Sequence, residues 1–98
     1  MRLEVLWDVI RSVPPGRCAA YGAIGRSLPN PATGFQVGRW MAQCPEDVPW
    51  WRVVSKDGTF PIDRRHPGLG LEQRTLLERE GVVFNGSRVD MGASGWEG

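Results

Sequence analysis

Two clusters of proline divide the first half of this chain into short segments that cannot join into one long helix. Residues 14–16 read Pro-Pro-Gly and residues 29–31 read Pro-Asn-Pro. Proline breaks a helix because it lacks the backbone N–H and clashes with the preceding turn. Between the breaks, apolar residues recur at helical spacing. This pattern predicts three helices, at about residues 3–13, 21–28 and 31–43.

The third predicted helix has two different faces. Asn30 suits its N-cap and Pro31 its first position. One face carries apolar residues at helical spacing, which we expect to pack on the core: Val37, Trp40, Met41 and Cys44. The other face carries small residues, an aromatic ring and an arginine: Gly34, Phe35, Gly38, Arg39 and Ala42. Because glycine costs roughly 1 kcal/mol in a helix interior, this face favours close contact with a partner over contact with water.

The second half of the chain is expected to contain less helix. Two short strands are predicted in residues 51–60 around Lys56-Asp57-Gly58, as a hairpin or wing. A loop with arginine, glycine and proline residues follows at 61–70. A fourth helix is predicted at 71–80, with Gly81 as its C-terminal stop.

A further strand or hairpin is predicted at residues 82–91 around Asn85-Gly86, and a flexible tail at 92–98. A chain of 98 residues has the length of one domain, which we assign to residues 1–91. Three short helices followed by a hairpin are typical of a winged-helix-like helix-turn-helix domain. The predicted fold class is therefore mainly α with a small β hairpin.

The net charge of +1 conceals an uneven distribution. Residues 9–45 contain four arginines and no acidic residue, whereas seven basic and nine acidic residues follow from Glu46 onward. This asymmetry indicates an anionic partner for the first half, although arginines solvated on an ordinary surface are an equal alternative. No apolar run approaches the ~18 residues of a membrane span, and the N-terminus is unlike a signal peptide. We therefore expect a cytoplasmic protein without a membrane partner.

Four short motifs occur in order along the chain. Residues 13–24 read Val-Pro-Pro-Gly-Arg-Cys-Ala-Ala-Tyr-Gly-Ala-Ile, residues 36–38 Gln-Val-Gly, residues 49–53 Pro-Trp-Trp-Arg-Val and residues 76–81 Leu-Leu-Glu-Arg-Glu-Gly. Together they resemble the O6-alkylguanine-DNA alkyltransferases, whose active-site motif reads Pro-Cys-His-Arg-Val. The chain departs from that motif at Trp50, in place of the alkyl-accepting cysteine, and at Trp51, in place of the histidine. A tryptophan at the cysteine position is typical of the alkyltransferase-like proteins, non-catalytic relatives of the alkyltransferase C-terminal domain.

The resemblance implies lesion binding without catalysis. An indole offers no activated lone pair for displacing an alkyl group, so no catalytic residue is expected, and no metal or cofactor. The resemblance implies a helix-turn-helix in the minor groove and a damaged guanine flipped into a pocket. The residues expected to form this lesion pocket are Tyr21, Trp50, Trp51, Val53 and Arg64. The residues expected to contact DNA are Gly34, Phe35, Gly38 and Arg39, with Phe35 as an apolar wedge in place of the family's intercalating arginine.

Some implied roles stay open. Trp51 either extends the pocket or fills the space of the missing histidine, and we favour packing. Glu80 matches the acid that partners this histidine, and we expect a structural contact instead. Arg64 and Arg65 align loosely with a pocket-closing loop of the family, and a solvated loop is equally compatible with their sequence.

The implied function is that of a non-enzymatic DNA damage sensor. It would act as a monomer in the cytoplasm, associated with the nucleoid when bound to double-stranded DNA that contains O6-alkylguanine. It would flag the lesion for nucleotide excision repair through a UvrA-type damage sensor.

Two alternatives belong to other classes. A winged-helix transcription regulator would need polar base-reading side chains, which the third helix lacks. A true alkyltransferase would need Cys18 or Cys44 as its acceptor, and the sequence gives neither cysteine an activating context. These two cysteines and His66 also lack the spacing of a metal site, which favours two buried free thiols.

Overall fold

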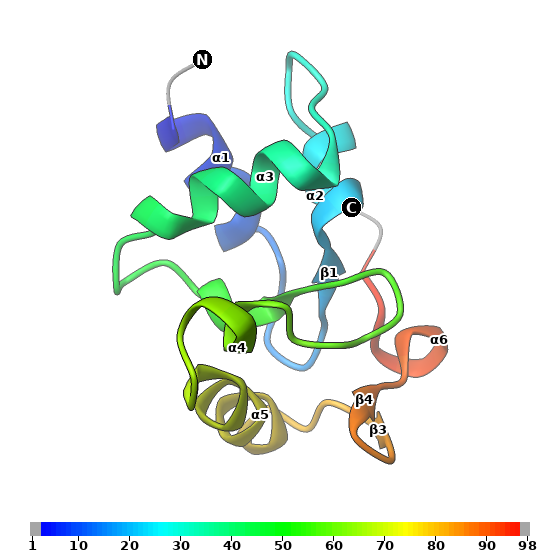
Figure 1. Cartoon of the computed structure of the whole chain (residues 1–98). Helices are drawn as coiled ribbons and strands as arrows, with labels where there is room; N and C mark the ends of the chain where they lie inside the picture. The colour runs from blue at the N-terminus through cyan, green and yellow to red at the C-terminus, as the bar shows by residue number, and fades with distance from the viewer. Residues whose placement is uncertain (1–2, 97–98) are drawn as a thin grey trace.

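The computed structural model describes residues 3–96 and is mainly helical, as the sequence predicts, with two small strand pairs. The elements in chain order are α1 (Leu3–Arg11), β1 (Ala19–Ala20), α2 (Tyr21–Arg26), α3 (Gly34–Trp40), the 3-10 helices η1 (Met41–Gln43) and η2 (Trp50–Arg52), β2 (Val53–Val54), α4 (Ile62–Arg65), α5 (Leu69–Arg79), β3 (Phe84–Asn85), β4 (Arg88–Val89) and α6 (Met91–Ser94). Figure 1 shows α1, α2 and α3 on one side of β1, and α4, α5 and the β3–β4 hairpin on the other side.

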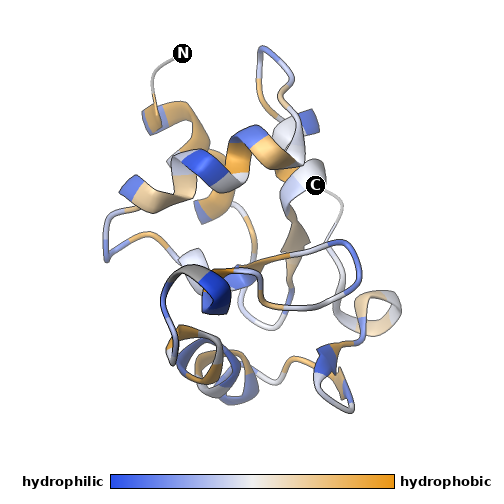
Figure 2. Ribbon diagram, in the orientation of Figure 1, coloured by the Kyte–Doolittle hydropathy of each residue, from blue (hydrophilic) through white to orange (hydrophobic). Residues whose placement is uncertain are grey.

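Two groups of buried apolar side chains meet at the parallel pair β1–β2. Strand residues alternate between the two faces, so Ala19 and Val53 join the first group, whereas Cys18 and Val54 join the second. The first group lies among α1, α2 and α3, and the second lies beside α5 and the β3–β4 hairpin. In Figure 2 β1 is orange at the centre of the molecule, whereas α4 is largely blue. The strand pair therefore joins the helix-turn-helix half to the rest of the core.

The start of α3 differs from the prediction. Thr33, not Asn30, is the N-cap: its hydroxyl accepts a hydrogen bond from the Gln36 backbone N–H at 3.1 Å. The Gln36 side chain accepts one from the Thr33 N–H at 3.0 Å. This reciprocal capping box satisfies two backbone donors at once, which explains why the helix begins at Gly34 instead of Pro31.

The predicted core stripe of α3 is confirmed. Val37 is fully buried, and Trp40, Met41 and Cys44 pack against the first core group. The last of the expected helical residues form the tighter turn η1 instead of continuing α3. The apolar stripe therefore continues from one side of α3 into η1. The opposite side of α3 faces away from the core.

The hairpin predicted at residues 51–60 is wrong. Residues 50–52 form η2, and β2 pairs in parallel with β1 instead of antiparallel with residues 59–60. Residues 55–59 do form a turn, in which the Ser55 N–H donates to the Thr59 carbonyl at 3.1 Å. The hydroxyls of Ser55 and Thr59 hydrogen-bond Asp57 and lower its pKa to about 2. Gly58 has a φ of +84°, and its carbonyl accepts from the Val89 N–H.

The hairpin predicted around Asn85-Gly86 is confirmed, because β3 and β4 pair antiparallel in that stretch. The expected loop at 61–70 contains the short helix α4. Asp63 of α4 accepts hydrogen bonds from the backbone N–H groups of Gly68 and Gly70, each at 3.0 Å. A carboxylate that binds the first N–H groups of a helix stabilises its start, so α4 fixes where α5 begins.

The tail expected from Gly92 onward is wrong for residues 92–96. Asp90 caps α6, and the segment after it bonds to the residue before β1. The Cys18 N–H donates to the Ser94 carbonyl and the Trp96 N–H donates to the Cys18 carbonyl, both at 2.8 Å. Glu97 and Gly98 lie outside the described residues. Within the described range, no helix has the length and apolar character needed to cross a membrane.

Candidate nucleic-acid interface

A cleft of about 980 Å³ opens between α3 and η1 on one side and α4 and α5 on the other. The predicted residues that line this cleft are Tyr21, Gly34, Phe35, Gly38, Trp50 and Trp51. Sequence reasoning missed lining residues from three other elements: Met41 of η1, Ile62 of α4, and Leu69 and Leu76 of α5. These side chains make much of the wall apolar, which suits a flat, partly apolar ligand.

Three predicted site residues lie outside the cleft lining. Arg64 is exposed on α4, and the side chain of Arg65 lies outside the described part of the structure. Arg39 is exposed and borders a smaller cavity of about 300 Å³, which Trp40 also lines. Val53 is buried, and its backbone N–H donates to Trp50 while its carbonyl accepts from Gln73 at 2.9 Å. Val53 was expected in the lesion pocket, but both of its backbone polar groups bond within the protein.

The outer side of α3 presents an exposed aromatic ring beside a glycine. Phe35 is 73% exposed. Among the described residues, a Cβ built on Gly38 would meet no atom within 4 Å outside the backbone of its own helix, so packing within the protein does not require glycine there. The position instead leaves room for another molecule to approach the helix backbone.

Trp50 and Trp51 form a corner of the cleft. They stand on η2 instead of a strand, so both side chains reach the same cavity. Their ring centroids are 6.0 Å apart and their planes are inclined by 86°. This edge-to-face geometry is a favourable arrangement of aromatic pairs, and it gives the cleft two flat walls at nearly a right angle.

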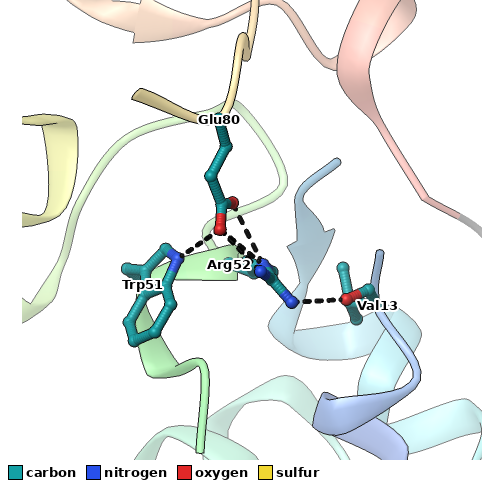
Figure 3. A network of polar contacts seen from close by, with 4 residues as sticks. All are labelled: Val13, Trp51, Arg52 and Glu80. Carbon is teal, nitrogen blue, oxygen red and sulfur yellow. Dashed lines mark hydrogen bonds and ion pairs between the residues drawn. The ribbon is translucent and has the colours of Figure 1, made fainter. Parts of the chain in front are cut away.

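Glu80 connects this corner to the rest of the fold, as Figure 3 shows. The Trp51 indole N–H donates to Glu80 Oε2 at 3.1 Å. The Arg52 guanidinium donates to both carboxylate oxygens, with Nη2 2.6 Å from Oε2, and its Nη1 donates to the Val13 carbonyl at 2.9 Å. Burial raises the pKa of Glu80, but hydrogen bonds from Arg52 and Trp51 outweigh it and lower the pKa. Glu80 therefore holds Trp51 as an ionised carboxylate.

Gln73 holds the backbone of the same corner. Its side chain is 1% exposed, and Nε2 donates to the Trp51 carbonyl at 3.0 Å and to the Val53 carbonyl at 2.9 Å. Gln73 lies on α5 and Glu80 is the C-cap residue of the same helix. Their separation of seven residues places them on one face, two turns apart. One face of α5 therefore fixes both the backbone and the side chain of Trp51.

Charge around the cleft is more balanced than the sequence suggested. Two acidic residues of the second half, Glu46 and Glu72, line the cleft together with Lys56. In the acid-free stretch, Arg11 pairs with Asp8 at 3.1 Å and with Asp47 at 3.5 Å. Exposed ion pairs of this kind contribute little to stability, but this one reduces the positive charge available to an anionic partner.

A family model described as 6-O-methylguanine DNA methyltransferase, DNA binding domain, matches residues 3–82. The chain belongs to this family. Among curated relatives, a DNA base-flipping protein of Escherichia coli is 32% identical over 94 residues, covering 93% of this chain and 70% of the relative. Alkyltransferase-like protein 1 of Schizosaccharomyces pombe is 38% identical over 80 residues, covering 79% of this chain and 72% of the relative.

Solved structures agree with this assignment to the alkyltransferase-like proteins. The crystal structure of S. pombe Atl1 in complex with damaged DNA containing O6-carboxymethylguanine matches with a TM-score of 0.82 at 28% identity, over all of both chains. An O6-methylguanine methyltransferase variant of Mycobacterium tuberculosis matches with a TM-score of 0.66 at 26% identity, over 79% of this chain and 46% of that one. The resemblance inferred from the four motifs is therefore confirmed.

The two cysteines of this alkyltransferase-like chain are free thiols in unreactive surroundings. Burial and the nearby Glu80 raise the pKa of Cys18 to about 12. Burial and Asp47 raise the pKa of Cys44 to about 11, although Cys44 lines the cleft. A thiol must lose its proton to attack an alkyl group, so neither is activated. Among residues 3–96, no group of histidine, cysteine and acidic side chains is arranged to hold a metal ion.

Proposed function

We propose that this alkyltransferase-like chain is a non-enzymatic sensor that binds O6-alkylguanine in duplex DNA. The observation that carries the proposal is the cleft of about 980 Å³ that lies beside the exposed Phe35 and is walled by Trp50. Ligand pockets typically measure about 300–1,000 Å³, so this cleft has room for a flipped nucleotide. The relative named for base flipping and the Atl1 complex with O6-carboxymethylguanine DNA support the same function.

In this proposal α3 enters the minor groove with its outer side. Gly38 removes bulk where the helix backbone meets the groove, and Phe35 inserts between bases as an apolar wedge. Flipping costs a few kcal/mol of stacking and pairing, and less for a damaged pair. Tyr21 lines the cleft from the start of α2 and supports the extruded nucleotide. Arg39, exposed one turn after Phe35, contacts a phosphate or the neighbouring base.

No alkyl transfer accompanies binding in this proposal. Trp50 stands in the motif position of the acceptor cysteine, and an indole has no activated lone pair. The raised pKa values of Cys18 and Cys44 argue against either thiol as a substitute acceptor. The Trp50 ring instead contributes a flat apolar wall for the alkyl group.

Because binding leaves the lesion in place, another protein must remove it. The proposed route is nucleotide excision repair, in which the monomeric sensor on cytoplasmic, nucleoid-associated DNA is recognised by a UvrA-type damage sensor. Capture of such a sensor by the chain on a duplex with O6-methylguanine, and not on the matched guanine duplex, tests this route. Equal capture on both duplexes would argue against a lesion-dependent handover.

A titration with two matched duplexes tests the sensor itself. Tryptophan fluorescence is measured while a duplex with one guanine or one O6-methylguanine is added, and intact masses of protein and DNA follow. We expect tighter binding of the alkylated duplex and unchanged masses. Equal affinity for the two duplexes would instead favour a DNA-binding regulator, and a methylated protein would show an alkyltransferase.

A further inference from the structure

We propose that Trp51 is a positioning residue, which fixes the ring of Trp50 as a rigid wall of the cleft. The positioning is a property of the free protein, whereas its consequence for lesion binding rests on the proposed function. The inference starts from the corner geometry: two indoles on one 3-10 turn, inclined by 86° with centroids 6.0 Å apart, both facing one cavity.

Trp51 is held at several independent points. Its indole N–H donates to Glu80 at 3.1 Å, and its carbonyl accepts from Gln73 at 3.0 Å. The Arg52 guanidinium lies 5.6 Å from its ring centroid, within the range of a cation–π contact. Its ring also packs against the second core group. These contacts come from several parts of the fold, so the ring is restrained from more than one direction.

Trp50 has fewer restraints. Its side chain is half-buried, and within residues 3–96 its indole makes no hydrogen bond. The one aromatic contact described for its ring is the edge-to-face contact with Trp51. The orientation of the cleft wall therefore depends on the neighbouring indole, which in turn depends on Glu80.

The anchor itself is stiff. Glu80 is clamped by two nitrogens of Arg52, and the side chains of this ion pair are only 13% and 16% exposed. A hydrogen bond to an ionised carboxylate is stronger than one between neutral groups. A wall that is rigid before binding spares the complex the entropy of ordering it. Loss of the hydrogen bond between Trp51 and Glu80 should therefore weaken lesion binding, although the Trp50 ring itself is still present.

The first test observes Trp50 in the DNA-free protein. The tryptophans are replaced by 5-fluorotryptophan, and the Trp50 resonance is assigned in the ¹⁹F NMR spectrum by its loss in Trp50→Phe. In the unsubstituted chain we expect one sharp Trp50 signal. Trp51→Phe keeps an aromatic ring but removes the N–H donor to Glu80, and we expect a broadened or doubled Trp50 signal. Trp96→Phe removes a half-buried indole outside the cleft and is expected to leave the Trp50 signal sharp.

The second test measures affinity for the O6-methylguanine duplex. If the Trp50 ring adopts the competent orientation about one fifth to one tenth of the time in Trp51→Phe, the apparent Kd rises about five- to tenfold. Affinity for the matched guanine duplex should not change, and Trp96→Phe should behave like the unsubstituted chain. If Trp51→Phe does not fold, Trp51→Leu is used instead, since leucine keeps apolar contact with the second core group. The expected Trp50 signal and Kd are the same.

A folded Trp51 variant with a sharp, unshifted Trp50 signal and an unchanged Kd would overturn the positioning role. Equal affinity of the unsubstituted chain for both duplexes would instead remove the proposed function, and the ¹⁹F comparison would still decide the positioning role. A broadened Trp50 signal together with a raised Kd supports both proposals.

Discussion

Gly34 of α3 lies so close to Gly22 of α2 that a Cβ added to Gly34 would sit 3.0 Å from the Gly22 backbone nitrogen. One turn later on α3, a Cβ on Gly38 would meet no atom of residues 3–96 within 4 Å beyond the backbone of α3 itself. The two glycines of α3 therefore serve different purposes. The first permits two helices to pack closely, and the second leaves space on the outer side.

Replacing Gly34 or Gly38 by alanine should have different effects on stability and on DNA binding. Gly34→Ala forces α2 and α3 apart, and we expect a loss of about 1–3 kcal/mol of unfolding free energy, as in other overpacked sites. Gly38→Ala should stabilise the protein by up to about 1 kcal/mol, because alanine favours a helix, and yet weaken DNA binding. Urea unfolding and a duplex titration measure both effects. Equal stability changes for the two variants would contradict this division.

Phe35→Ala should raise the Kd for the O6-methylguanine duplex about tenfold, which is about 1.4 kcal/mol, because the wedge is lost. Stability should stay within about 0.5 kcal/mol, as for other surface changes. Leu71→Ala is the matched control, since Leu71 is 72% exposed, similar to Phe35 at 73%, and lies outside the cleft lining. Equal effects of the two substitutions on DNA binding would show that Phe35 is not a wedge.

Trp50→Cys should not restore alkyl transfer. A new thiol at this position still needs a base to remove its proton, and Trp51 provides only a donor, which is already bonded to Glu80. Intact mass after incubation with excess O6-methylguanine duplex is expected to show no added methyl group. A methylated protein after one turnover would mean that another group in the cleft serves as the base.

Glu80 should make stability depend on pH in the acidic range. Its folded-state pKa is lowered, so its contribution is present above the unfolded carboxyl pKa of about 4.3 and is lost as the pH falls through the folded pKa. Urea unfolding of the unsubstituted chain and of Glu80→Gln, from about pH 6 to about pH 3, measures this. We expect the stability difference between them to shrink as the pH falls. A constant difference would exclude an ionised Glu80 as the anchor.

Features set by neighbouring residues could be predicted from the sequence. The helical spacing of Leu6, Trp7 and Ile10 predicts α1, and these three side chains are buried. The pair Asn85-Gly86 predicts the β3–β4 hairpin, in which Gly86 has a φ of +64°. The N-cap of α3 was predicted wrongly, although a cap depends on neighbouring residues. Asn30-Pro31 and Thr33-x-x-Gln36 both fit a helix start, and the second satisfies more backbone donors.

Features that depend on residues far apart could not be predicted in the same way. The run of Trp50 to Val54 looks like a strand, but Gln73 and Glu80 from α5 hold its first part as a 3-10 turn. Nothing in the local pattern identifies Gln73 as buried, because glutamine is usually exposed. The family resemblance identified Trp50 and Tyr21, which line the cleft, and placed the segment of α4 near the pocket through Arg64, but it gave no sign of the α5 wall.

Residues 93–96 bind the segment directly before β1, and this contact affects how the protein folds during synthesis. The strand pairs with β2, and Cys18 directly before it bridges to Gly95. Arg17 donates to the Ala93 carbonyl across a separation of 76 residues. Contacts of such long sequence separation form late and slow folding. The helix that begins with Tyr21 directly follows this strand. In a nascent chain the contacts from residues 93–96 to the segment before this helix therefore form only after these residues have left the ribosome. Ribosome-bound chains stalled before that point should have an open, protease-sensitive β1, long after α1, α2 and α3 have been made.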